Sequence, residues 1–284
     1  MLNKNVQVFI GCEAEFAEAS LVLFGAPFDS TTSNRPGARF GPRAIRQESD
    51  GLETYSPYQN KDLGDYQICD CGDLELPFGD SEVALGLIEE AAAEILAAGK
   101  TPLMLGGEHS VTLGAVRAAL KKYPDLQIIH FDAHTDLRQD YLGVTLSHAC
   151  VLRRCWDLLG DGRIFQFGIR SGDRPEFIWA AEGHTKLQKF DFTGLGEIIE
   201  KLGNKPIYFT VDLDVLDPAE FPGTGTPEAG GVSFKQLLAA IQIVCRGNVV
   251  AADINELAPM LDPSGISTAI AGKLTRELML ALLK

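Results

Sequence analysis

The sequence predicts an α/β fold in which helices cover both faces of a parallel sheet. Two observations support this prediction: short apolar segments typical of buried strands, and amphipathic segments typical of helices that alternate with them. A chain of 284 residues can form such a fold as one unit. Because no linker, internal repeat or low-complexity segment divides the chain, we expect residues 1–284 to form a single domain.

Six short apolar segments are expected to be strands of this sheet. In chain order they are residues 21–24, 102–105, 127–131, 164–167, 207–211 and 249–252. Residues 53–80, rich in Gly, Pro, Asp and aromatic side chains, predict a loop with one further strand at residues 66–69.

Three segments predict helices. Residues 81–98 form a long amphipathic stretch, in which we expect Ser81 to cap the first turn and Gly99 to end the helix. Residues 233–245 and 268–283 are also expected to be helical, and the apolar character of the second predicts that it docks on the body of the protein.

The composition excludes some classes of partner. Acidic residues outnumber basic ones, 39 to 25, and the net charge is −14. Such a chain repels phosphate backbones and anionic lipids, so neither nucleic acid nor a membrane is an expected partner. The negative field attracts a small cationic molecule, although an acidic surface also simply keeps a protein in solution.

The N-terminal ten residues lack the basic start and apolar core of a secretory signal, and no apolar stretch approaches the length of a membrane span. We therefore expect a soluble, cytoplasmic protein. Its six cysteines are scattered without Cys-x-x-Cys spacing, which indicates reduced thiols rather than disulfides or a zinc site.

Metal-type ligands follow the predicted strand at residues 127–131. Asp132, His134 and Asp136 occupy every second position, and side chains two residues apart in extended backbone point the same way. One strand end can therefore direct two carboxylates and an imidazole at one point, as a hard or borderline divalent cation requires.

Two further strands end in the same way. Asp212 and Asp214 follow residues 207–211, and His109 follows residues 103–108. Singly, an Asp after a strand is more often a helix cap or part of a turn, and a His is more often an ordinary hydrogen-bonded side chain. Parallel strands, however, bring their carboxyl ends to one crevice. Together the six residues predict a site for two cations.

The ligand types indicate the metal and the chemistry. A carboxylate-rich site without thiolates favours Mn²⁺ over Zn²⁺ or copper, so two Mn²⁺ per chain are expected. A cation pair lowers the pKa of a shared water to supply hydroxide at neutral pH, which indicates hydrolysis. Asp132 and Asp212 are the candidates to bridge the ions, with His109 and Asp136 completing one site and His134 and Asp214 the other.

Two residues outside this set are candidates for the reaction itself. His148 is a candidate proton carrier, and the alternative is that it caps the following helix. Glu256, at the end of the last predicted strand, can pair with a planar guanidinium in bidentate fashion, and the alternative is an ordinary solvated loop acid.

With these residues in place, the chain resembles the ureohydrolase family, the arginases and agmatinases that hydrolyse guanidino groups to urea with two manganese ions. The resemblance covers nearly the whole chain. It is carried by residues 25–29, 37–46, 106–110, 132–136, 147–148, 210–217 and 222–231 and by Glu256.

The resemblance implies roles for individual residues. It assigns His109, Asp132, Asp136 and Asp212 to one manganese, and His134, Asp132, Asp212 and Asp214 to the other. It makes Asp136 the proton shuttle to the leaving amine, His148 a helper in proton transfer, and Glu256 the carboxylate that holds the guanidinium. It also implies a three-layer α/β/α fold and a homotrimer or homohexamer.

Within the family, residues 222–231, which include Thr226 at the expected substrate site, look more like an agmatinase than an arginase. The resemblance thus implies hydrolysis of agmatine to putrescine and urea, a step of polyamine biosynthesis. Arg138 stands where arginases carry an Asn that binds the substrate carboxylate, and Ser171 replaces an acid near the α-amino group, while Asp173 remains.

Other readings stay open. Arg138 can hold a carboxylate, which suits guanidinobutyrate or formiminoglutamate as the substrate. Arginine is a further alternative. If Arg138 is instead solvated or salt-bridged, agmatine remains the expected substrate. A zinc deacetylase resembles this fold but uses fewer ligands, and a regulatory metal-binding protein of this fold would usually have lost a ligand or the proton-transfer group.

Overall fold

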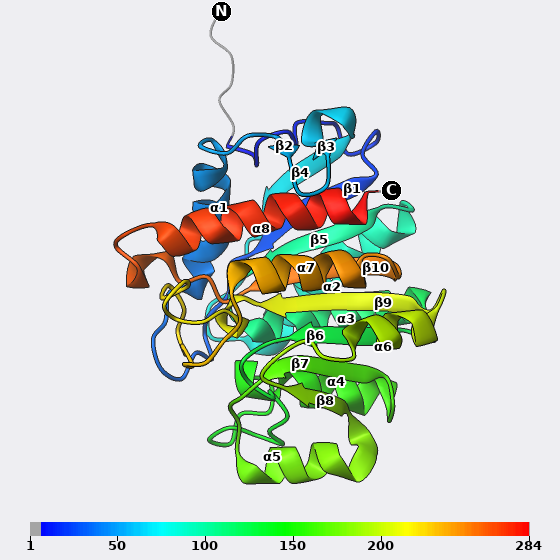
Figure 1. Cartoon of the computed structure of the whole chain (residues 1–284), viewed down its shortest axis with the longest axis vertical. Helices are drawn as coiled ribbons and strands as arrows, with labels where there is room; N and C mark the ends of the chain where they lie inside the picture. Colours follow the sequence, from blue (N-terminus) through cyan, green and yellow to red (C-terminus); the bar gives the residue numbers. More distant parts are fainter. Residues whose placement is uncertain (1–6, 284) are drawn as a thin grey trace, which may run out of the picture.

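An eight-stranded sheet forms the centre of the protein, whose structure is a computed structural model that describes residues 7–283 (Figure 1). Every pair of neighbouring strands in this sheet is parallel. In order across the sheet the strands are β4 (Ile68–Asp73), β1 (Leu21–Ala26), β5 (Thr101–Gly106), β10 (Asn248–Asn255), β9 (Pro206–Asp212), β6 (Gln127–Phe131), β7 (Ile164–Ile169) and β8 (Lys186–Lys189).

Helices cover both faces, which gives the three layers that the family resemblance implies (Figure 1). One face packs against α1 (Gly41–Ser49), α6 (Leu195–Leu202), α7 (Phe234–Val244) and α8 (Ile266–Leu282). The other packs against α2 (Ser81–Ala97), α3 (Thr112–Lys122) and α4 (Val151–Leu159). The short α5 (Arg174–Trp179) lies beyond β8, and β2 (Tyr55–Ser56) pairs with β3 (Lys61–Asp62) in a separate hairpin.

The central strands are apolar because both of their faces are buried. In β9, Phe209 belongs to the core under α6 and α7, whereas the adjacent Tyr208 belongs to the core under α2, α3 and α4. Phe209 meets Phe131 of β6 edge-on, with ring centroids 4.9 Å apart. Two separate apolar cores therefore hold the sheet between its helix layers.

The six strands expected from apolar segments are all present, and most extend by one or more residues. The two edge strands differ from the expectation. β4 runs over Ile68–Asp73 rather than residues 66–69, and β8 was not predicted. An edge strand pairs along one side only, so a polar segment such as Lys186–Lys189 can form one without an apolar signature.

The three predicted helices are confirmed within a few residues at each end, but the predicted cap of the first is wrong. Asp80, not Ser81, is the N-cap residue of α2, and its side chain accepts the backbone N–H of Val83 at 3.1 Å. In α7 the cap is Ser233, which forms a capping box with Gln236.

The expectation about a secretory signal concerns residues 1–10, of which residues 1–6 lie outside the described part of the chain. Among the helices of residues 7–283, none combines the length and the apolar character that crossing a membrane requires.

The strand order explains how the predicted site comes together. β5, β10, β9 and β6 are four consecutive strands, and all of them end at the same edge of the sheet. Residues that follow them in the sequence, from His109 to Glu256, are therefore neighbours in space.

Candidate metal centre

The residues singled out in the sequence line one pocket of about 260 Å³ at this edge of the sheet. Five of the six predicted ligands, all except Asp132, line the pocket itself, and Asp132 lies fully buried beneath it. The other predicted residues that line the pocket are Arg138, His148, Asp173, Thr226 and Glu256.

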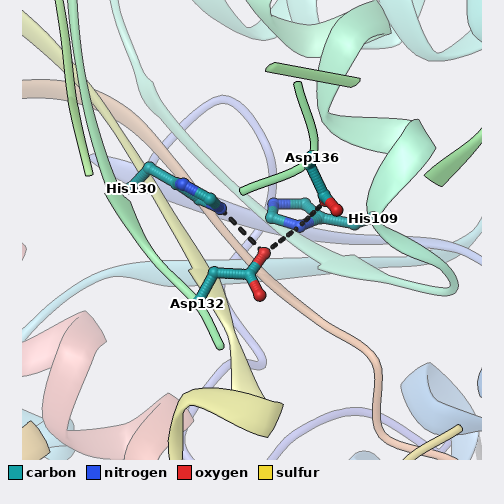
Figure 2. A group of neighbouring side chains, drawn as sticks. All are labelled: His109, His130, Asp132 and Asp136. Atoms are coloured by element: carbon teal, nitrogen blue, oxygen red, sulfur yellow. Dashed lines mark hydrogen bonds and ion pairs between the residues drawn. The ribbon is translucent and has the colours of Figure 1, made fainter. Parts of the chain in front are cut away.

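The first group of candidate ligands surrounds the imidazole of His109 (Figure 2). Its Nδ1 lies 3.0 Å from Asp132 Oδ2, 3.1 Å from Asp136 Oδ2 and 3.4 Å from Asp212 Oδ2. Its Nε2 lies 2.8 Å from Thr210 Oγ1, so Thr210 fixes the plane of the ring and leaves Nδ1 directed at the carboxylates.

The second group surrounds the imidazole of His134. Its Nδ1 lies 2.9 Å from Asp214 Oδ2 and 3.4 Å from Asp132 Oδ1. The two oxygens of Asp132 therefore face different groups, and this carboxylate joins them. Asp212 Oδ1 accepts the backbone N–H of Asp214 at 2.8 Å, which holds these two acids in their relative positions.

The donor set fits two divalent cations. Neighbouring ligands of an octahedral cation with bonds of about 2.1 Å stand about 3 Å apart, which is the spacing found within both groups. The carboxylates also crowd one another: burial and the nearby Asp214 and Asp132 raise the pKa of Asp212 well above its usual range. Positive charge from bound cations would relieve this repulsion.

The pKa of Asp136 is raised to about 7, by burial first and then by the nearby Asp132. The pKa of Asp132 moves the other way. Burial alone would raise it, but the adjacent His130, His109 and His134 hold it well below its usual range.

The local backbone differs from the extended strand end that the sequence predicts. β6 ends at Phe131, and of Asp132, His134 and Asp136 only His134 forms a β-bridge, with Ser171. Asp136 reaches the site through a left-handed backbone conformation, φ +52°. Asp214 lies in a short 3₁₀ turn, Leu213–Val215, rather than in strand β9. The alternation therefore predicted correctly that these side chains are neighbours, but turns after the strands bring them together.

His148 lies beside the ligand groups with a partly unsatisfied ring. Its Nε2 lies 3.2 Å from Ser33 Oγ, and its Nδ1 is buried without a hydrogen-bond partner. Burial lowers the pKa of His148 to about 4, so the ring is neutral at neutral pH and one of its nitrogens keeps a free lone pair. The N-cap residue of the following helix, α4, is Cys150 and not His148, so the alternative role as a helix cap is not supported.

Glu256 is buried, with 6% of its surface exposed, and is not the solvated loop acid of the alternative reading. Its Oε1 accepts the backbone N–H of His109 at 2.8 Å, and its own N–H donates to the carbonyl of Gly107 at 2.9 Å. Gly107 itself must lack a side chain, because a Cβ there would lie 1.9 Å from the carbonyl oxygen of Phe28. Burial and the nearby Glu108 raise the pKa of Glu256 well above its usual range.

The rim of the pocket carries the residues predicted to contact the substrate's tail. Arg138 Nη1 lies 2.8 Å from Asp173 Oδ2, and its guanidinium stacks on the ring of Tyr141 at 4.5 Å. Arg138 is thus salt-bridged rather than unpaired. Thr226 Oγ1 lies 3.4 Å from Asp214 Oδ2.

Two side chains close to the ligands were not predicted. His130 is fully buried in β6 and its Nε2 lies 2.8 Å from Asp132 Oδ2 (Figure 2). It continues the alternation by two residues toward the N-terminus, which is the signal that could have identified it. Glu108, also fully buried, accepts the backbone N–H of Thr31 at 2.8 Å, and Thr31 in turn accepts the backbone N–H of His148.

Comparisons with known proteins place this geometry in context. A sequence model described as "Arginase family" matches residues 19–281. The chain is 48% identical to an agmatinase of Bacillus subtilis (strain 168) over 98% of this chain and 97% of that protein. It is 38% identical to a mitochondrial guanidino acid hydrolase of Homo sapiens, over 92% of this chain and 78% of that protein. The solved structure of agmatine ureohydrolase of Thermoplasma volcanium is similar with a TM-score of 0.90 and 36% identity, over 98% of this chain and 95% of that chain.

Proposed function

This chain belongs to the arginase family of metal-dependent hydrolases, and we propose that it hydrolyses agmatine to putrescine and urea with two Mn²⁺ bound. The observation that carries the proposal is the convergence of His109, Asp132 and His134 with three further aspartates beside a buried acid, Glu256. The similarity to agmatinases over nearly the full length of the chain supports the choice of substrate.

The proposed ligands divide as the two groups of side chains do. One Mn²⁺ is held by His109, Asp136, Asp132 and Asp212. The other is held by His134, Asp214, Asp132 and Asp212. Mn²⁺ suits a set of four carboxylates and two imidazoles without thiolates. When bound, such a pair of cations lowers the pKa of water and stabilises the charge that develops as it attacks.

Glu256 holds the guanidinium of the substrate in this proposal. A buried carboxylate is a strong partner for a planar guanidinium, because the two can form parallel charge-assisted hydrogen bonds. The bond from the His109 N–H fixes the carboxylate of Glu256 next to the first group of ligands. A guanidinium paired with Glu256 would therefore have its central carbon held against the ligand cluster.

Proton transfer is assigned to Asp136 and His148. Asp136 lies in the first group of ligands and carries a proton from the attacking water to the departing amine nitrogen. His148 assists, and the observation that supports this role is its buried Nδ1, which has no hydrogen-bond partner within the protein. The nitrogen leaves as an ammonium group, and the guanidino carbon gains the water oxygen as urea.

The pocket rim favours a substrate whose tail carries no carboxylate. The salt bridge with Asp173 compensates the charge of Arg138, and Tyr141 covers the face of its guanidinium. Asp173 and Thr226 then provide oxygen atoms that suit the amine of agmatine. A second candidate, an anionic guanidino acid, is favoured by the presence of Arg138 at the rim and by the similarity to a guanidino acid hydrolase.

Urea release in the presence of Mn²⁺ tests the proposal, with agmatine, arginine, guanidinobutyrate and guanidine as substrates and formamide release from formiminoglutamate in parallel. We expect agmatine to give the highest kcat/KM. Preference for guanidinobutyrate would select the second candidate. An absence of turnover with every substrate, in protein that binds two Mn²⁺, would favour a regulatory metal-binding protein instead.

We further propose that the protein acts in the cytoplasm as a homotrimer or homohexamer. The resemblance to the family supports the assembly, and light scattering coupled to size-exclusion chromatography measures it directly.

A further inference from the structure

His130 is fully buried beside Asp132 and does not line the pocket. Its Nε2 is 2.8 Å from Asp132 Oδ2, the same oxygen that faces His109 Nδ1 (Figure 2). A ring nitrogen of His130 lies within 4.8 Å of possible ligand atoms of His109, Asp132 and Asp136. His130 can therefore be either a seventh metal ligand or a hydrogen-bond donor to a metal ligand. The two readings require different tautomers of the ring.

Gln166 decides between them. It lies beside His130 on the neighbouring strand β7, where the two residues are paired in register. Its Nε2 lies 2.7 Å from the carbonyl oxygen of Thr135 and 3.1 Å from His130 Nδ1. A carbonyl oxygen only accepts hydrogen bonds, so the amide nitrogen, not the amide oxygen, must face Thr135.

A third residue fixes the other end of the amide. Thr185, which immediately precedes β8, donates its hydroxyl to Gln166 Oε1 at 3.0 Å. The amide is thus held by three partners, and its second N–H is directed at His130 Nδ1. Nδ1 therefore accepts, and the proton of the neutral ring is on Nε2, where it donates to Asp132.

An Nε2 that carries a proton has no lone pair for a metal ion. We propose that His130 is a positioning residue and not a metal ligand: with Gln166 and Thr185 it forms a buried relay that orients the Asp132 carboxylate toward both cations. This inference rests on the proposed role of Asp132 as a shared metal ligand.

The relay is well placed for this role. His130, Gln166 and Asp132 are fully buried, and 4% of the Thr185 surface is exposed, so water does not compete for these hydrogen bonds. Asp132 Oδ2 has two lone-pair directions, and the bond from His130 occupies one of them. The relay also fixes the carbonyl of Thr135, and thereby the loop that carries His134 and Asp136.

Two substitutions separate donation from coordination. Gln at position 130 can place an amide N–H near the position of the imidazole Nε2, so His130→Gln retains a donor to Asp132. His130→Leu removes it. A matched control is His184→Gln, because His184 also contacts an aspartate, with its Nδ1 2.7 Å from Asp161 Oδ1, but lies outside the pocket. Mn²⁺ affinity is measured by electron paramagnetic resonance of unbound Mn²⁺, and urea release from agmatine in parallel.

We expect His130→Leu to weaken Mn²⁺ binding about 10–100-fold, the usual effect of removing a partner of a metal ligand. His130→Gln should stay within about threefold of the parent, with two ions per chain retained, and His184→Gln should not change Mn²⁺ binding. Equal losses in His130→Gln and His130→Leu would overturn the proposal. If the parent binds Mn²⁺ but does not release urea, the proposed function fails while the binding comparison still tests the relay.

The tautomer itself provides a test that does not depend on a folded variant. The parent protein, labelled with ¹⁵N-histidine and loaded with diamagnetic Mg²⁺, should give the two-bond ¹H–¹⁵N pattern of an Nε2–H ring for His130. A ring protonated on Nδ1, or one with a metal-shifted Nε2, would contradict the relay.

Discussion

At the scale of single residues, the site depends on acids that are unfavourable without a partner of opposite charge. Asp212 and Glu256 are buried among other acids, and burial together with those neighbours raises the pKa of each well above its usual range. Asp132 is stabilised by three imidazoles, and its two oxygens face different ligand groups. Such an arrangement is costly for folding and is typical of functional sites.

The role of Glu256 is tested by Glu256→Gln. The amide oxygen can still accept the His109 N–H, so the fold of the site should persist while the charge partner of the guanidinium is lost. We expect KM for agmatine to rise and kcat to fall, with kcat/KM reduced about 10–100-fold, the range for a lost hydrogen bond to a charged group. Steady-state urea release measures this, and Glu200→Gln on the exposed side of α6 serves as the control. An unchanged KM would place Glu256 outside the substrate site.

The pair of Arg138 and Asp173 is tested by removing each charge in turn. Asp173→Asn should leave Arg138 with only the more distant Glu176, 3.9 Å away, as a charge partner, which lowers kcat/KM for agmatine and raises it for guanidinobutyrate. Arg138→Gln should raise kcat/KM for agmatine and lower it for guanidinobutyrate. We expect changes of up to about fivefold, because a partly exposed ion pair contributes at most about 1 kcal/mol. If both variants changed the two substrates in the same direction, the pair would not select for tail charge.

At the scale of elements, the sequence is informative where both faces of a strand are buried and less so elsewhere. β5, β6 and β9 are continuous apolar segments, which is why their ends could be recognised as ligand positions. The polar edge strand β8 could not be recognised in this way. The position of β9 and β10 between β5 and β6 in the sheet was also not predictable, because it depends on long-range crossovers. His130 was missed because a histidine within an apolar strand is more often a satisfied core residue than part of a site.

The start of α2 gives a matched pair of substitutions. Asp80 accepts the Val83 N–H and caps the helix, whereas the adjacent Ser81 is already its first residue. Asp80→Ala should therefore cost about 1 kcal/mol of stability, and Ser81→Ala should change it by less than about 0.5 kcal/mol. Thermal unfolding followed by circular dichroism measures both. A larger loss in Ser81→Ala than in Asp80→Ala would restore the cap expected from the sequence.

At the scale of the whole molecule, the net charge of −14 and the crowded acids of the site act in the same direction. Both favour binding of cations, whether metal ions or a positively charged substrate. The four adjacent strand ends indicate that one site draws on the four central strands of the sheet, within a family match that covers residues 19–281.

Metal binding should therefore stabilise the entire fold. At free Mn²⁺ about 100 times Kd, we expect about 2.7 kcal/mol of stabilisation and a rise in Tm of about 5 °C. Asp212→Asn should have a metal-free Tm equal to or above that of the parent, since it removes a carboxyl whose ionised form is disfavoured by burial and by the nearby Asp214 and Asp132. The rise in Tm on adding Mn²⁺ should be smaller for Asp212→Asn than for the parent. Differential scanning calorimetry with chelator or Mn²⁺ makes the comparison, and an equal gain in both proteins would count against Asp212 as a ligand.

The central claim is that side chains from adjacent strand ends hold two cations together. Anomalous diffraction at the manganese edge from crystals grown with Mn²⁺ tests it most directly. We predict two peaks about 3.5–4 Å apart, one beside His109 and Asp136 and the other beside His134 and Asp214, with Asp132 contacting both. A single peak, or two peaks away from these residues, would contradict the account.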